Sequence, residues 1–285
     1  MTETLPDELL DDVLAHSLAL SPTDFLAFPD EPGSGPPRSS GPVLVSKRWL
    51  RIGTPHLYAC VRLAKPAHTA AVAALLRAQP HVGRAVRCLR LEGGLGRELV
   101  HVAAAAPRLE RLYVAMCVKA AESVAGLRSS LPLLRPRHLY LENDGGARDN
   151  QKAVEVRQAL QAYLQSAEPS LEFMALSDEF HGMDEVWASA IAASSVEELS
   201  CRSSSMEGWI VDGVMHTMLQ DSRPQRVVCR GTYRESSVRL RLQRKGLAAD
   251  IEKFAFIRHL EDHKIDMSLQ RRKEHLSRTA DDEEL

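Results

Sequence analysis

A short pattern of apolar residues recurs along most of this chain and is the feature that most constrains its fold. The pattern is apolar-x-x-apolar-x-apolar. Its clear copies read VRCLRL, LERLYV, LEFMAL and VEELSC, and two weaker copies read PRHLYL and PQRVVC. The second apolar position falls at residues 89, 112, 139, 174, 199 and 227, at intervals of 23, 27, 35, 25 and 28 residues, with one insertion around residues 145–150. Such a period indicates a repeat protein, in which each unit buries its apolar face against its neighbours.

Between the copies lie stretches with helical character, most of which end in a proline, a serine pair or another polar break. They are residues 98–106, 119–131, 151–165, 184–193 and 208–220. An apolar strand followed by a helix in each unit predicts an α/β fold, a curved leucine-rich-repeat-like solenoid over residues 64–246 with parallel strands inside and helices outside. A doubly wound α/β domain also alternates strands and helices. The repeated pattern and the lack of a glycine-rich first strand-to-helix turn weigh against that alternative.

The last part of the chain, residues 247–285, is expected to close the solenoid and to end in a charged tail. Just before it, SVRLRLQRKG alternates apolar and basic residues, which predicts a half-buried edge strand with outward arginines. In LAADIEKFAFIRHL the apolar residues recur on one helical face, which predicts a capping helix over residues 247–260. Beyond residue 266 the chain is highly charged, and we expect no packed structure there.

The composition argues against several classes of protein. Of the 285 residues, 44% are hydrophobic and 26% are charged, as in ordinary globular chains. No apolar run approaches the roughly 18 residues of a membrane helix, and a net charge of −2 predicts no general attraction to nucleic acid. The five cysteines include no C-x-x-C pair, so no disulfide framework or zinc ribbon is indicated. Without a signal-peptide pattern at the N-terminus, we expect a cytoplasmic or nuclear protein.

No sequence motif indicates catalysis. GGLG at residues 93–96 follows a predicted strand but lacks the ending of a phosphate-binding loop, so we interpret it as a turn. His259 and His263 are four residues apart in HLEDH, but the H-E-x-x-H order and a third ligand are missing. No G-x-S-x-G motif is present. We therefore predict a protein that is not an enzyme and has no catalytic residue, metal or cofactor.

The predicted strands also carry side chains that point away from the core, because side chains alternate between the two faces of a strand. In a curved solenoid this second face is concave and can hold a partner. Tyrosine and arginine are the residue types that dominate protein interfaces. We therefore predict a target-binding surface on this face. Its candidate residues are Arg90, Tyr113, Tyr140, Arg202 and Arg230.

The N-terminal segment predicts a helix, a further helical turn at SPTDFLAF (residues 21–28), and, after a breaker, a second long helix. LPDELLDDVLAHSLAL has Pro6 in a first-turn position, acids that suit a helix N-terminus, and apolar residues on one face. Residues 29–42 are rich in proline, glycine and serine, so no helix can cross them. From residue 43 the chain, VLVSKRWLRIG, is again helical in character, and Gly53, Thr54 and Pro55 are expected to end that helix.

This segment resembles an F-box. The likeness rests on LPDELL at residues 5–10 with Val13 and Leu14, on SPTDFLAF at residues 21–28, and on LVSKRW at residues 44–49. It covers residues 1–63, with residues 29–42 as an insertion. In F-box proteins the opening and closing helices dock onto the Skp adaptor of a cullin-RING ubiquitin ligase. The resemblance implies these adaptor-binding residues: Leu5, Pro6, Leu9, Leu10, Val13, Leu14, Leu44, Val45 and Trp49.

An F-box followed by leucine-rich-repeat-like units is similar to the substrate receptors of that ligase. The stretch LVSKRWLRIGTPHLY is similar to the corresponding sequence in fungal members. The resemblance implies a non-catalytic subunit that binds the Skp adaptor with its N-terminal helices and an unknown target protein with its solenoid. The alternative is a protein-interaction scaffold with a vestigial F-box, whose helices pack on the first repeat and whose Trp49 is buried within the chain. Neither interpretation involves nucleic acid or a membrane.

Overall fold

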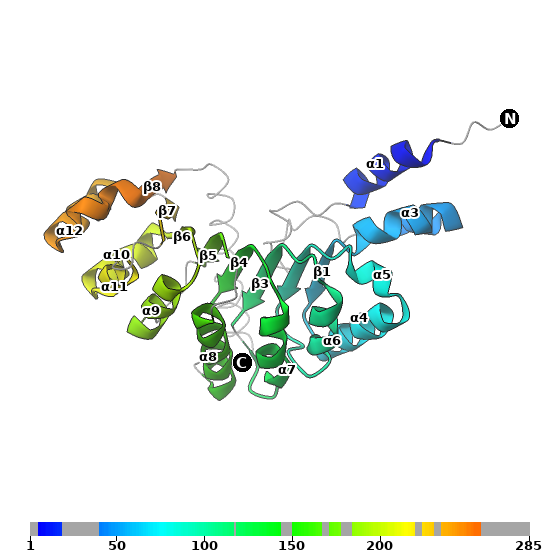
Figure 1. Ribbon diagram of the computed structural model, residues 1–285, viewed down its shortest axis with the longest axis horizontal. Helices are drawn as coiled ribbons and strands as arrows, with labels where there is room; N and C mark the ends of the chain where they lie inside the picture. The colour runs from blue at the N-terminus through cyan, green and yellow to red at the C-terminus, as the bar shows by residue number, and fades with distance from the viewer. Residues whose placement is uncertain are drawn as a thin grey trace, which may run out of the picture.

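The computed structural model describes residues 5–18, 40–116, 118–143, 150–166, 171–177, 184–219, 224–230 and 235–257, apart from the side chains of residues 202–205, 207, 230, 256 and 257. These residues form one parallel sheet and a layer of helices, with a pair of N-terminal helices at one end (Figure 1). The predicted α/β class is therefore confirmed.

The sheet follows the order of the sequence. All neighbouring strands are parallel, and none is out of order, whereas a doubly wound sheet reverses its strand order at a switch point. The repeat pattern predicts β2 to β7, and β1 and β8 extend the sheet by one strand at each end. The strands are β1 (Cys60–Leu63), β2 (Cys88–Leu91), β3 (Arg111–Ala115), β4 (His138–Glu142), β5 (Phe173–Leu176), β6 (Glu198–Arg202), β7 (Arg226–Arg230) and β8 (Phe254–Ile257).

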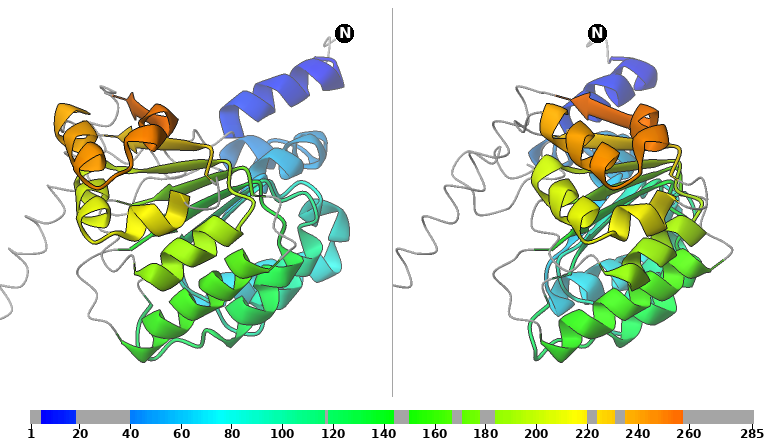
Figure 2. Two further views of the ribbon diagram at one scale, coloured as in Figure 1. Left: turned by 60° about the vertical axis from the view of Figure 1, so that its left-hand side comes forward. Right: turned by 90° about the vertical axis from the view of Figure 1, so that its left-hand side faces the viewer.

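Helices cover one face of this sheet, as the two views in Figure 2 show. A parallel neighbour can be reached only by a crossover connection, and each of the crossovers between these strands contains at least one helix. The elements of this layer and of the C-terminal end are α4 (Pro66–Ala78), α5 (Pro80–Gly83), α6 (Leu99–Ala105), α7 (Ala125–Ser130), η2 (Leu131–Leu133), α8 (Gln151–Gln165), α9 (Glu185–Ala193), α10 (Ser203–Val211), α11 (Val214–Leu219), α12 (Glu235–Arg244) and η3 (Ala248–Lys253).

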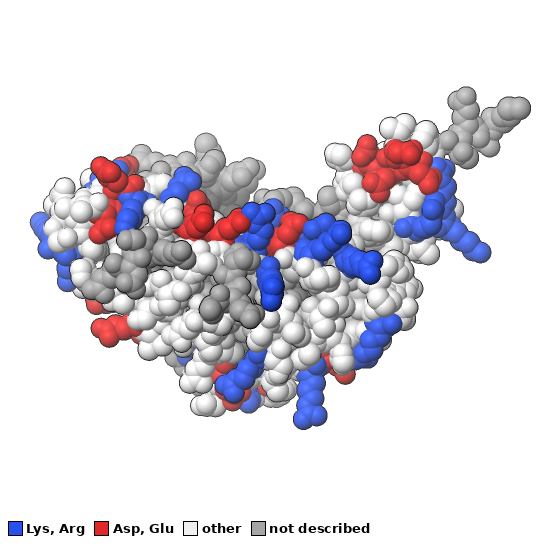
Figure 3. Space-filling model, in the orientation of Figure 1, with Lys and Arg blue, Asp and Glu red and all other residues white. Residues whose placement is uncertain are grey.

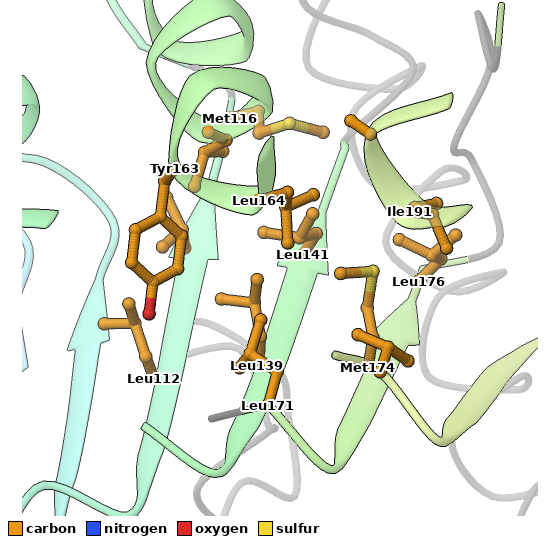
Figure 4. Packing of buried hydrophobic residues seen from close by; sticks show 14 of the residues in the cluster. Leu112, Met116, Leu139, Leu141, Tyr163, Leu164, Leu171, Met174, Leu176 and Ile191 are labelled. Atoms are coloured by element: carbon orange, nitrogen blue, oxygen red, sulfur yellow. The ribbon is translucent and has the colours of Figure 1, made fainter. Parts of the chain in front are cut away.

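The recurring apolar positions form the core between the sheet and the helices. Their side chains pack against helix residues such as Tyr163, Leu164 and Ile191 (Figure 4). The second position of the pattern is fully buried in all six copies, and register pairing joins these residues into one continuous row. The pattern recurs because each strand must supply the next members of this row. The row consists of Leu89, Leu112, Leu139, Met174, Leu199 and Val227.

A backbone ladder joins each unit to the next, just before the strands. The carbonyl of Ala59 accepts hydrogen bonds from the N–H groups of Arg87 and Cys88, at 2.8 and 2.9 Å. The carbonyls of residues 87, 110, 137 and 172 likewise each accept two hydrogen bonds, from two N–H groups of the following unit. The entries of β2 to β6 are thereby fixed to the preceding strand, which keeps these units in register.

Two predictions about the C-terminal end of the sheet are wrong. The expected edge strand at residues 237–246 lies mostly in helix α12, and the expected capping helix at residues 247–260 forms η3 and strand β8, up to residue 257. Val238 and Leu242 are one helical turn apart and both fully buried, whereas Leu240 between them is 46% exposed. The four-residue spacing therefore decided the conformation of α12. Pairing with β7 then decided that of β8, where Phe254 is buried.

Three predicted helices are confirmed to within one residue at each end, namely α6, α8 and α9. The side chain of Asp184 caps α9 by accepting from the N–H of Trp187 at 2.9 Å. The helix expected over residues 119–131 begins only at residue 125, and that expected over residues 208–220 is divided into α10 and α11. Gly213, with a φ of +82°, lies between these two helices, because only glycine adopts this conformation readily.

Candidate functional site

The N-terminal helices form a module with a hydrophobic core of its own. The module consists of α1 (Asp7–Leu18), η1 (Gly41–Leu44) and α3 (Lys47–Leu57), and Figure 1 shows α1 and α3 side by side at the β1 end of the sheet. Among the described residues, its core is a cluster separate from the one under the sheet. The buried members are Leu10, Leu14, Leu18 and Val43, with Trp49, Ile52 and Leu57 packed against them.

Ion pairs fix α1 against α3. The carboxylate of Asp7 accepts hydrogen bonds from Arg48 Nε at 2.6 Å and from Arg51 Nη2 at 2.8 Å. The pKa of Asp7 is lowered, first because of the hydrogen bond from Arg48. Asp11 contacts His56 Nε2 at 2.7 Å one turn further along. Figure 3 shows acidic side chains gathered over α1 beside basic side chains over α3. These contacts hold the N-terminal half of α1 against α3.

Gly53 allows the helices of the module to approach closely. A Cβ atom at this position would lie 2.5 Å from Cγ1 of Val43 and 3.3 Å from methyl carbons on α1. The prediction that residues 53–55 end the helix is wrong, because α3 continues through Pro55 to Leu57. A proline inside a helix loses one backbone hydrogen bond, and the packing of Gly53 and Leu57 against α1 outweighs that loss.

Six large apolar side chains of the module remain exposed to solvent. Three of them follow one another at four-residue intervals before and along α1, which places them on one helical face. The other three lie around the start of α3, which a hydrogen bond from Arg48 to the carbonyl of Leu5 holds beside the start of α1. The exposed fractions are 43% for Leu5, 51% for Leu9, 48% for Val13, 74% for Leu44, 63% for Val45 and 46% for Leu50. We call these six residues the apolar row.

The residues predicted to bind an adaptor divide into two groups. Leu10 and Leu14 are 1% and 0% exposed, because they lie on the face of α1 that packs into the module core. Trp49 is half-buried in the same core. The prediction that these three side chains are docking residues needs correction, since they hold the module together. The predicted residues that do lie on the surface are Leu5, Pro6, Leu9, Val13, Leu44 and Val45.

Sequence reasoning missed Leu50, which belongs to the apolar row. The position of Leu50 directly after Trp49 could have predicted its exposure. Successive residues of an α-helix are turned by about 100° from one another, so a Trp49 that packs toward α1 leaves Leu50 on a different side of α3.

The face of the sheet without helices is not an open binding surface at two of the predicted positions. Arg90 is 1% exposed and Tyr113 is 5% exposed, so the prediction that they are accessible is wrong. The Arg90 guanidinium lies 4.3 Å from the centre of the Tyr113 ring and pairs with Glu92, while the Tyr113 hydroxyl donates to the carboxylate of Glu142. Burial, with the nearby charge of Glu142, raises the pKa of Tyr113. Groups on neighbouring strands thus cover one another and bury the Arg90 guanidinium.

The other predicted target-binding residues lie on the same sheet. Tyr140 is the register partner of Tyr113, is half-buried, and has its ring 5.6 Å from that of Phe173. Arg202 and Arg230 are register partners at the ends of β6 and β7. Their side chains lie outside the described part of the structure. The fold thus brings Arg90, Tyr113 and Tyr140 into one row across three strands.

His138 on this face should make stability depend on pH. Its pKa is lowered, first by burial and then by the charge of Arg111. An unfolded chain therefore takes up a proton near the ordinary pKa of about 6.5, whereas the folded chain does so only at lower pH. The stability contributed by the neutral imidazole is therefore present above about pH 6.5. It is lost as the pH falls from there through the lower pKa of the folded state. We expect the urea midpoint to fall more between pH 7.5 and pH 5.5 in the wild type than in His138→Phe, and equal decreases would contradict this.

The other candidate motifs do not form a site in the described part of the chain. Gly94 in GGLG has a φ of +67° and its carbonyl accepts from Thr69 Oγ1 at 3.0 Å, as expected for a turn packed on α4. His259 and His263 lie outside the described residues. No cluster of three or more potential metal ligands occurs among the residues that are described. None of the helices in the described ranges combines the length and apolar character that a membrane span requires.

The chain matches no protein-family model, and searches of curated proteins and of solved structures find no significant match. The functional argument therefore rests on the residues of this chain.

Proposed function

We propose that this chain is the non-catalytic substrate-recognition subunit of a Skp/cullin/F-box ubiquitin ligase. In this proposal the Skp adaptor binds the apolar row, a target protein binds the repeat-like part, and the protein acts in the cytoplasm or nucleus without a cofactor. The observation that supports it best is the apolar row itself, which stays exposed on a module whose core is already formed. Exposed apolar patches of this kind are typical of docking sites.

Covering this surface would supply part of the energy of a specific interface. Full burial of a leucine or valine side chain contributes about 1.5–3 kcal/mol. The six residues of the apolar row are roughly half exposed, so covering them contributes on the order of 5–9 kcal/mol before the cost of association. The acidic side chains of α1 add orientation and association rate more than affinity.

The alternative of a vestigial F-box expects the helices of the module to pack on the first repeat, with Trp49 buried within the chain. Among the described residues, Trp49 is half-buried in the module's own cluster with Ile52 and Leu57, and this cluster is separate from the core under the sheet. This arrangement leaves the apolar row for a partner and favours the adaptor hypothesis. For the target, the remaining candidates are Tyr140, which is half-buried, and the two arginines at positions 202 and 230.

The proposal is tested by binding of the full chain to a purified Skp adaptor. We expect the wild type to bind and Val45→Asp to lose about 100-fold in affinity or more, because an aspartate at a buried contact must be desolvated without a partner. Calorimetry or surface plasmon resonance measures the two dissociation constants.

Leu133→Asp is the matched control for this substitution. Leu133 is 46% exposed, as an apolar residue of the row would be, but it lies in η2 of the helix layer. We expect Leu133→Asp to bind the adaptor like the wild type. A wild type that does not bind, or a Val45→Asp variant that binds unchanged, would refute the proposed function.

A further inference from the structure

Cys60 and Cys88 lie opposite each other at the start of two neighbouring strands. The two residues are register partners in the parallel pair of β1 and β2. Neighbouring strands are about 4.8 Å apart, which is inside the range of roughly 4.4–6.8 Å between the Cα atoms of disulfides. Both side chains belong to a small cluster around Tyr113 on the face of the sheet without helices. We call this the Cys60–Cys88 pair.

The two thiols are in contact and differ in their access to solvent. Cys88 is 5% exposed, whereas Cys60 is only half-buried. The pKa of Cys88 is raised, first because of its hydrogen bond with Cys60, so the two sulfurs are in contact. Arg111, the next register partner of Cys88, contributes a nearby positive charge. A partly exposed thiol in contact with a second thiol is an arrangement that oxidants convert to a disulfide.

The position of β1 also favours a bond between the two sulfurs. β1 is an edge strand of the described sheet and pairs only with β2. A disulfide requires the Cβ atoms to approach to about 4 Å, and an edge strand can shift toward its one neighbour without disturbing pairing on its other side.

We propose that Cys60 and Cys88 form a reversible oxidation site, at which a peroxide converts the two thiols into a disulfide. The Cys60 thiolate attacks the O–O bond of hydrogen peroxide and becomes a sulfenic acid, and the departing oxygen takes up a proton and leaves as water. The Cys88 sulfur then displaces the sulfenic hydroxyl, which leaves as a second water with the Cys88 proton. Two thiols and one peroxide thus give one disulfide and two waters, and a dithiol reverses the reaction. The site does not depend on the proposed ligase function.

Cys201 and Cys229 provide a matched pair in the same chain. They are register partners in β6 and β7, but they are 1% and 2% exposed and belong to the core between the sheet and the helices. If register alone decided oxidation, both pairs would react. If access to the oxidant is also required, only the Cys60–Cys88 pair should react in the native protein.

The test treats the native full chain with hydrogen peroxide, then denatures it, alkylates the remaining thiols with iodoacetamide and maps the cysteines by mass spectrometry. We expect a linked Cys60–Cys88 peptide that disappears after treatment with dithiothreitol, while Cys201 and Cys229 are recovered as alkylated thiols. The proposal is overturned if Cys60 and Cys88 are both recovered alkylated, or if either is linked instead to a third cysteine.

Single variants separate the roles of the two thiols. In Cys88→Ala, Cys60 should accumulate as a sulfenic acid that dimedone labels, because no neighbouring thiol displaces its hydroxyl. In Cys60→Ala, Cys88 should stay a thiol under the same treatment. Dimedone labelling of Cys88 in Cys60→Ala, without labelling of Cys60 in Cys88→Ala, would contradict the assignment of Cys60 as the attacking sulfur. The mapping of the wild type decides the proposal even if a variant fails to fold.

Discussion

Replacing Gly126 with alanine is expected to destabilise the protein by about 3 kcal/mol, at the upper end for overpacking of a core. A Cβ atom at this position in α7 would lie 1.8 Å from the carbonyl oxygen of Gly96 and 2.8 Å from that of Leu95. The loop cannot retreat, since the Leu95 carbonyl accepts hydrogen bonds from the N–H groups of Gly126 and Leu127, and Leu95 is 1% exposed. Urea denaturation followed by circular dichroism measures the change.

Gly208→Ala is the control for this prediction. Gly208 lies inside helix α10, and no atom would come within 4 Å of an added Cβ atom. Alanine in a helix is favoured over glycine by about 1 kcal/mol, so this variant should be slightly more stable than the wild type. Equal urea midpoints for Gly126→Ala and the wild type would show that the turn at residues 93–96 can move, contrary to its hydrogen bonds.

Replacing Leu14 with aspartate is expected to unfold the N-terminal module. Leu14 is 0% exposed and lies in the small cluster between α1, η1 and α3. Burying an unpaired carboxylate there, together with the loss of the apolar contacts, costs about 4 kcal/mol or more. A core with so few buried residues cannot offset that cost. Amide hydrogen exchange should show loss of protection in α1 and α3, while the strands β2 to β6 stay protected.

Leu9→Asp is the matched variant on the other face of α1. Leu9 is 51% exposed, so the same chemical change should alter stability by no more than about 0.5 kcal/mol. It belongs to the apolar row and should weaken adaptor binding while leaving the exchange pattern unchanged. Equal loss of protection in Leu9→Asp and Leu14→Asp would mean that α1 has no distinct core and surface faces, and the basis for the docking proposal would fail.

The recurring apolar pattern was sufficient to predict most of the sheet. Leu89 and Leu112 are register partners on adjacent strands and are both fully buried, as their places in the pattern require. The pattern failed at the two ends. β1 (CVRL) contains only part of it, and β8 (FAFI) lies in a stretch whose apolar residues also fit a helical period. Short apolar runs fit both periods, and pairing with an existing strand decides between them.

The candidate site could be predicted only in part. The motif identified the two helices of the module, and Val45 and Leu9 lie on its surface as the resemblance implies. A motif does not show which apolar residues face a partner and which face the chain itself, so Leu10 and Leu14 were assigned to the wrong face. Likewise, Arg90 looks like an interface residue in the sequence but is covered by its contacts with Glu92 and Tyr113.

The sequence by itself determined the α/β class, the order of the strands β2 to β7 and the two-helix N-terminal module, because periodicity and breakers act locally along the chain. Only the tertiary structure decided which side chains are exposed, that α3 continues past Pro55, and that Cys60 meets Cys88. Each of these depends on the packing of segments that are distant in sequence: α1 lies against α3, and β1 lies beside β2. Exposure and sulfur contact are properties of such neighbours, and no local pattern encodes them.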